Sequence, residues 1–111
     1  MIRAILVGCA VVALAAPAAA DEPLGPDLAE SRLRGCLLAG SSAVTRKDLE
    51  GAVIQVRAYC GAQIKQVREQ RVAAATQNLK GDEARDAADR AVRVLNQEIA
   101  LAVSNFTGIA P

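Results

Sequence analysis

The stretch CLLAGSSAVTRKDLEGAVIQVRAYC, residues 36–60, begins and ends with the two cysteines that follow the first twenty residues of the chain. A zinc site needs about four ligands, and the chain has no histidine to complete a set that starts from two thiols. A redox pair usually has the Cys-x-x-Cys spacing, and a thiol nucleophile needs a histidine base. In an exported protein such a pair is read as a structural bond. We therefore predict a disulfide between Cys36 and Cys60.

The first twenty residues have the three parts of a secretory signal peptide. Arg3 supplies a short positive region, residues 5–16 are an apolar run, and small residues precede an expected cleavage between Ala20 and Asp21. The apolar run is shorter than the roughly 20 residues that span a bilayer. We expect export to the periplasm or the extracellular medium, with no integral membrane segment after cleavage.

A lipoprotein signal is the alternative for this leader. Residues 6–9, Leu-Val-Gly-Cys, resemble a lipoprotein box, which would place a lipid on Cys9. The apolar run continues past Cys9, and few residues precede it, so we do not expect a lipid anchor.

Composition excludes some classes of function. The chain has 12 acidic residues, and with Arg3 removed 12 of its 13 basic residues remain, so the mature charge is zero. A general nucleic-acid or anionic-membrane binder would show an excess of basic residues, and we expect no nucleic-acid partner. Residues 21–111 are enough for one domain with a small core.

The mature chain is predicted to begin with a linker and a short helix. Residues 21–26 contain two prolines and a glycine, which disfavour regular structure. A helix is expected over residues 27–39, with Asp27 as its N-cap, Glu30 completing a capping box and Gly40 ending it.

A long second helix is predicted over residues 45–80, with a capping pattern from Thr45 to Asp48 and a stop at Gly81. Gly61 lowers helix propensity, so it marks a kink or a close backbone approach. The helical period places one apolar stripe inward: Leu49, Val53, Val56, Cys60, Ile64 and Val67.

The third helix is predicted over residues 82–106, with Gly108 ending it and Ile109 folding back as a hydrophobic contact. One stripe consists of Ala88, Ala91, Val92, Leu95, Ile99, Ala102, Val103 and Phe106. A second stripe, Ala87, Val94 and Leu101, lies beside it. Two adjacent stripes indicate that this helix meets two neighbours.

These elements predict an all-α fold, a small three-helix bundle made of one short helix and a long antiparallel helical hairpin, within a helical domain of residues 27–111. The short connection at Gly81 makes the second and third helices antiparallel. A bond between Cys36 and Cys60 then places the first helix against the hairpin, where we expect it to cover the second stripe of the third helix. The hairpin tip extends beyond it.

The tip is the predicted partner surface because small residues let another helix approach closely. A second copy or a different protein could dock there. The residues of this surface are Val72, Ala73, Ala74, Ala75, Ala84, Ala87, Ala88 and Ala91.

Two charged clusters are read as solvated helix faces. Lys65, Arg68 and Arg71 lie on neighbouring turns and could bind an anion. Acidic residues at the start of the third helix could attract a cation, but they suit the helix dipole and lack the loop of a calcium site. We expect no metal, cofactor or catalytic residues.

The function predicted from the sequence is that of a small exported bacterial protein, an interaction or structural module of the cell envelope. One alternative is a small ligand carrier, which would need an enclosed apolar cavity. The other is an all-helical enzyme that uses Arg, Glu and Gln side chains. Gln63 and Arg71 approach the inner face, but the sequence shows no convergent set around them.

Overall fold

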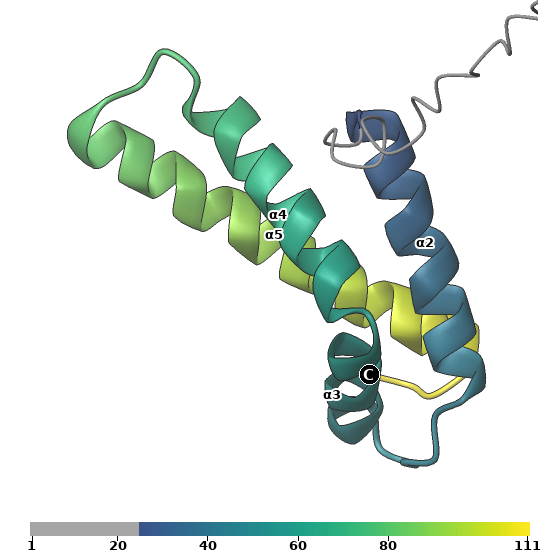
Figure 1. The fold of residues 1–111 in the computed structure, drawn as a ribbon. Helices are drawn as coiled ribbons and strands as arrows, with labels where there is room; N and C mark the ends of the chain where they lie inside the picture. Colours follow the sequence, from purple (N-terminus) through teal and green to yellow (C-terminus); the bar gives the residue numbers. More distant parts are fainter. Residues whose placement is uncertain (1–24) are drawn as a thin grey trace, which may run out of the picture.

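The computed structural model describes residues 25–111, and in this part of the chain every regular element is a helix (Figure 1). The four helices are α2 (Pro26–Ser42), α3 (Leu49–Tyr59), α4 (Gly61–Thr76) and α5 (Gly81–Thr107). The all-α prediction is confirmed, whereas the prediction of three helices is wrong. The predicted signal peptide, its cleavage after Ala20, the alternative lipid site at Cys9 and most of the predicted linker lie outside the described residues.

The extra helix arises because the predicted helix 45–80 is interrupted at Cys60. This residue ends α3 and begins α4, with backbone angles of φ −103° and ψ 21°. Hydrogen bonds of the α-helical type persist on both sides, from the Cys60 N–H to the Val56 carbonyl and from the Ile64 N–H to the Cys60 carbonyl. The expected kink near Gly61 is therefore real and falls one residue earlier.

The ends of α2 differ from the prediction. Gly25 is the N-cap and Pro26 occupies the first turn, so Asp27 lies inside the helix. The helix also continues through Gly40 to Ser42. A Cβ atom added at Gly40 would lie 3.0 Å from Cδ1 of Tyr59, so this glycine allows α2 and α3 to approach closely rather than ending the helix.

The start of α3 is set by Asp48 rather than Thr45. The Gly51 N–H donates a 2.8 Å hydrogen bond to the Asp48 carboxylate, which makes Asp48 the N-cap. The preceding loop is fixed separately, because Gln55 accepts hydrogen bonds from the backbone N–H groups of Thr45 and Arg46.

The prediction for the end of α5 is confirmed. Gly108 is in the left-handed region at φ 78°, and its N–H donates to the Ser104 carbonyl. Ile109 then turns back and packs against the core.

Three contacts confirm that α2 runs antiparallel to α3 and α4. Glu30 bonds to Arg71, Cys36 bonds to Cys60, and Gly40 lies against Val56 and Tyr59. The core between the helices is made of Ala29, Leu33, Leu37, Ala52, Val56, Cys60, Ile64, Val67, Leu95, Ile99 and Val103.

The position of α2 against α5 corrects one expectation. Leu33 and Leu37 of α2 share a recess with Leu95, Ile99 and Ala102, all on the first predicted stripe of α5. In the second stripe, Val94 is 45% exposed and Leu101 is 58% exposed. Helix α2 therefore packs on the edge of the first apolar stripe of α5. It leaves Val94 and Leu101 of the second stripe exposed, contrary to the expectation.

The hairpin of α4 and α5 projects past the N-terminal end of α2 (Figure 1). Since Glu30 in the first turns of α2 lies beside Arg71 and Arg71 contacts Glu98, residues 72–93 extend beyond α2. We call residues 72–93 the arm, and the other described residues, which surround the disulfide, the body. None of the described helices is sufficiently long and apolar to cross a membrane.

Candidate functional site

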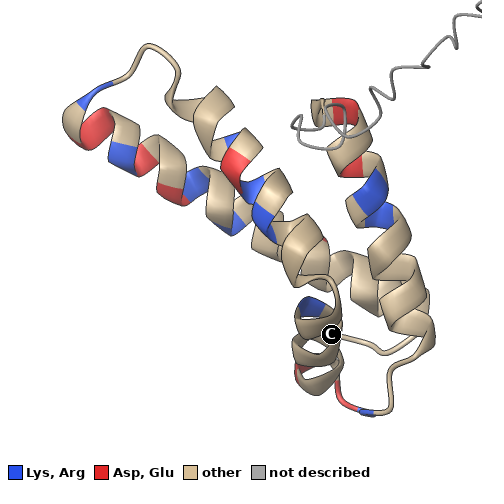
Figure 2. Ribbon diagram, viewed as in Figure 1, with Lys and Arg blue, Asp and Glu red and all other residues tan. Residues whose placement is uncertain are grey.

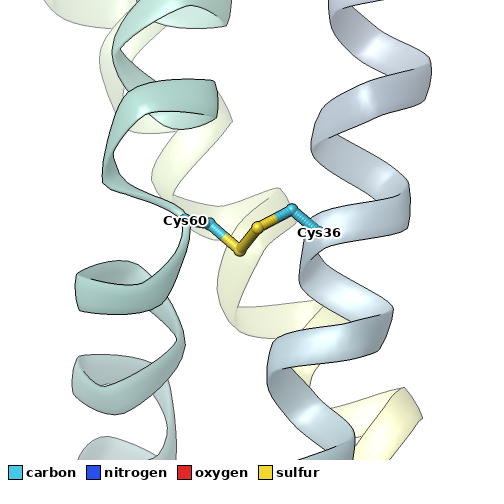
Figure 3. The surroundings of a disulfide bond; sticks show 2 residues. All are labelled: Cys36 and Cys60. Atoms are coloured by element: carbon cyan, nitrogen blue, oxygen red, sulfur yellow. A yellow bond between two sulfur atoms is a disulfide. The ribbon is translucent and has the colours of Figure 1, made fainter.

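The disulfide joins the middle of α2 to the junction of α3 and α4 (Figure 3). The Cα atoms of Cys36 and Cys60 are 5.8 Å apart, within the range for such a bond. Cys60 is fully buried and belongs to the core. The predicted pairing is therefore present, and the bond is a structural clamp inside the body.

The predicted partner surface is only partly one surface. Ala75, Ala87 and Ala91 line a shared groove on the arm. Ala73 and Ala74 are exposed on α4 and do not line this groove, whereas Val72, Ala84 and Ala88 are half-buried. The groove lies within the predicted segment, but a helix presents its residues in several directions, so a run of consecutive alanines cannot form a single face.

The groove on the arm is open and largely apolar. Its small residues are flanked by Leu79 from the connecting loop, by Val94 from α5, and by the side chains of Arg71 and Arg90. Leu79 and Val94 were absent from the predicted surface. Val94 belongs to the second apolar stripe of α5, which the sequence pattern predicts α2 to cover.

A charged cluster that the sequence did not reveal lies where the arm meets the body. Two nitrogens of Arg71 donate hydrogen bonds of 2.9 and 2.8 Å to the two carboxylate oxygens of Glu30. Another nitrogen of Arg71 donates to Oε2 of Glu98. One arginine on α4 thus connects α2 and α5.

The hydrogen bonds shift the ionisation of both groups that share them. Those from Arg71 hold the pKa of Glu30 below its usual value of 4.5, against the opposing effect of burial. Hydrogen bonding to Glu30, and then to Glu98, raises the pKa of Arg71. The cation and the Glu30 anion therefore persist together across the physiological pH range.

The cluster borders a recess between α2 and α5 that also contains Arg34 and several core leucines. Its volume of about 200 Å³ is below the roughly 300–1,000 Å³ of small-molecule sites. Three of the five N–H donors of the guanidinium are engaged by the two carboxylates, so this group is committed mainly to the ion pairs. The arrangement suits an ion-paired clamp better than a carrier cavity or an enzyme pocket.

The other charged residues do not converge. Lys65 lies 4.0 Å from Glu69 on an exposed face, and Arg71 is occupied by its carboxylates, so the anion site considered for Lys65, Arg68 and Arg71 is not assembled. Acidic and basic residues are interspersed along the arm part of α5 (Figure 2). Within residues 25–111 no group of three potential metal ligands comes together.

A second hollow lies at the opposite end of the molecule, between the C-terminal ends of α2 and α5. Arg46, Lys47 and Ser41 are among the residues that line it, and the buried hydroxyl of Ser41 has no hydrogen-bond partner among the described residues. The C-terminal ends of both helices carry partial negative charge, which stabilises these cations and weakens the binding of an anion.

Comparison with known proteins gave no relative. The chain matches no protein-family model, and no curated protein or solved structure is significantly similar to it. Its function must therefore be inferred from its own residues.

Proposed function

We propose that the protein is a small exported interaction module of the bacterial cell envelope that binds a protein partner through its arm. The observation that carries this proposal is the contrast between a clamped body and a hairpin arm with an open apolar groove. In this reading the body holds the hairpin in place and the arm makes the contact.

Export is proposed from two independent features of the chain. The first is the tripartite leader, with cleavage between Ala20 and Asp21. The second is the disulfide, since such bonds persist mainly in oxidising compartments. The periplasm and the extracellular medium are both consistent with these features.

The arm is suited to a helical partner for a physical reason. Alanines bury little area between α4 and α5, so the arm alone gains little from its own packing. The same small side chains let a third helix approach the hairpin closely, and its larger apolar residues would then contact the groove lined by Ala75, Leu79 and Ala91.

Crosslinking within the envelope tests the proposal. A photoreactive amino acid at Ala75, an arm position that lines the groove, is compared with one at Ala58, an exposed position on α3. We expect a discrete crosslinked product, recovered from the envelope fraction, from Ala75 but not from Ala58. Equal labelling at both positions would reject the arm as the binding element.

Export is tested in the same cells. Intact mass should show a chain that starts at Asp21, and thiol labelling under denaturing conditions should detect no free thiol on the mature chain. A retained leader or two reactive thiols would exclude export.

A further inference from the structure

The second stripe of α5 forms a repeating surface that α2 leaves open. The residues of that stripe, Ala87, Val94 and Leu101, form one series with Ala91 and Glu98, which lie between them, and its members are spaced alternately by four and three residues. This is the heptad spacing by which two helices pack along their length. Val94 and Leu101 are 45% and 58% exposed, so the described residues leave these two side chains largely uncovered, whereas Ala87 is 9% exposed.

We propose that a second copy of the chain covers this surface, with the two α5 helices antiparallel and a twofold axis near Val94. The inference rests on the proposed function, because it names the partner that the arm binds. In such a symmetric interface, two residues at equal distances from Val94 on the two chains face each other.

Charge complementarity selects this register. Arg90 and Glu98 are both four residues from Val94, so each Arg90 faces Glu98 of the second copy, and the pair occurs twice. Glu98 contacts Arg71 of its own chain through Oε2 and is 52% exposed. Its other carboxylate oxygen can therefore accept a hydrogen bond from Arg90 of the second copy.

Other registers lose these pairs. A shift of one heptad in one direction places Glu83 opposite Glu98, which brings like charges together. The opposite shift places Arg90 opposite Asn105. Parallel helices would place Arg90 against Arg90 and Glu98 against Glu98. The antiparallel register centred on Val94 is thus favoured over each of its neighbours.

The sizes of the side chains agree with the same register. Leu101 and Ala87 are both seven residues from Val94, so the exposed leucine of one copy reaches the alanine-lined groove of the other. Small residues at Ala75, Ala87 and Ala91 form this groove, and Leu79 lies at its edge. A large residue thereby meets a space that the arm leaves open.

The shape of the molecule leaves room for this contact. The arm projects past the N-terminal end of α2, so among the described helices only α4 and α5 border its groove (Figure 1). A second α5 can lie along this part of the hairpin without displacing the body.

A cysteine on the proposed axis tests the geometry. In the mature protein with its native disulfide, Val94→Cys should form a disulfide-linked dimer under mild oxidation. Arg93→Cys is the matched control, since it lies next to Val94 on the same helix but off the stripe and is also exposed. Equal dimer yields from both variants would overturn the proposed register.

Charge reversal tests the energetics by analytical ultracentrifugation. The mature protein should show a concentration-dependent dimer, and Arg90→Glu should raise the dimer Kd at least about tenfold, because it places two acidic residues together. Arg93→Glu makes the same charge change off the stripe and should leave the dimer Kd unchanged. Circular dichroism would verify that both variants remain helical.

The outcomes separate this inference from the proposed function. A monomer at every concentration, together with a crosslink from Ala75 to a different protein in the envelope, overturns self-pairing and leaves the interaction module in place. A monomer with no arm-specific crosslink overturns both. A dimer that Arg90→Glu weakens and Arg93→Glu does not supports the pairing.

Discussion

The body and the arm share helices α4 and α5, and the body also contains α2 and α3, but the two regions are held together by different means. In the body, the side chains of Val56, Val67, Leu95, Ile99 and Val103 are almost completely buried, and a disulfide closes the structure. In the arm, the most buried hydrophobic residue is Ala87, at 9% exposed. The difference suggests that folding energy is concentrated in the body, which leaves the arm surface available for binding.

The largest expected effect comes from removal of the clamp. Replacing both Cys36 and Cys60 by alanine should lower the free energy of unfolding by about 3.5 kcal/mol, because the unfolded chain is no longer constrained by the cross-link. Urea denaturation of the mature protein measures this loss. In reductant the wild type should be only slightly more stable than the double variant. Equal free energies of unfolding for the two proteins under oxidising conditions would contradict the role of the bond.

Adjacent residues on α5 test the second part of the comparison. Leu95 is 1% exposed in the core, whereas its neighbour Val94 is 45% exposed. Leu95→Ala should destabilise the protein by about 3 kcal/mol because it leaves a cavity. Val94→Ala should change stability by less than about 0.5 kcal/mol when measured on the monomer at low concentration. Similar losses for both would show that the second stripe is buried after all.

The ion-paired cluster at the boundary should have a smaller effect that depends on pH. Glu30→Gln should cost about 1 kcal/mol at neutral pH, a value reduced for the partial exposure of the pair. Because its folded pKa lies below 4.5, Glu30 stabilises the protein above that pH, and this contribution is lost as the pH falls through the folded pKa.

Denaturation at neutral and acidic pH checks this sign. The wild type should be more stable than Glu30→Gln at neutral pH, and this difference in the free energy of unfolding should disappear on acidification. Glu69→Gln is the control, since its contact with Lys65 is long and exposed, and it should change stability little at either pH. A difference between wild type and Glu30→Gln that does not depend on pH would exclude the Arg71 pair as its cause.

Features that depend on local sequence could be predicted, whereas features that depend on tertiary contacts could not. Periodicity located the helical segments, and elimination of other cysteine chemistries gave the disulfide, because both depend on local spacing and composition. The interruption at Cys60 was not predicted in full, since a helical pattern runs through it and one glycine is tolerated within a helix. The contact of Cys60 with α2 is a tertiary constraint that the local pattern does not contain.

The candidate site shows the same limit. Glu30 fits a local capping box, yet its partner is Arg71, which follows it by 41 residues. A capping box and an ion pair with Arg71 both place a carboxylate at the start of the helix, so the sequence spacing could not distinguish the two roles of Glu30. Likewise, two stripes on α5 predicted two neighbours, but the angle at which α2 approaches decided that Val94 and Leu101 remain exposed.

The smallest expected effect is confined to the arm. Gly81 has φ +59°, a conformation that costs other residues about 1 kcal/mol, so Gly81→Ala should loosen the turn between α4 and α5. Hydrogen exchange should become faster at amides of the arm while those of Leu95 and Ile99 stay protected, because the body opens separately. The matched control is Gly61→Ala in the body. Gly61 is the first residue of α4, and no atom lies within 4 Å of a Cβ added there. Alanine at this position should therefore stabilise the helix and should not accelerate exchange in the arm. Faster exchange throughout the protein in Gly81→Ala would mean that arm and body unfold as one unit, and the division between them would then have no energetic basis.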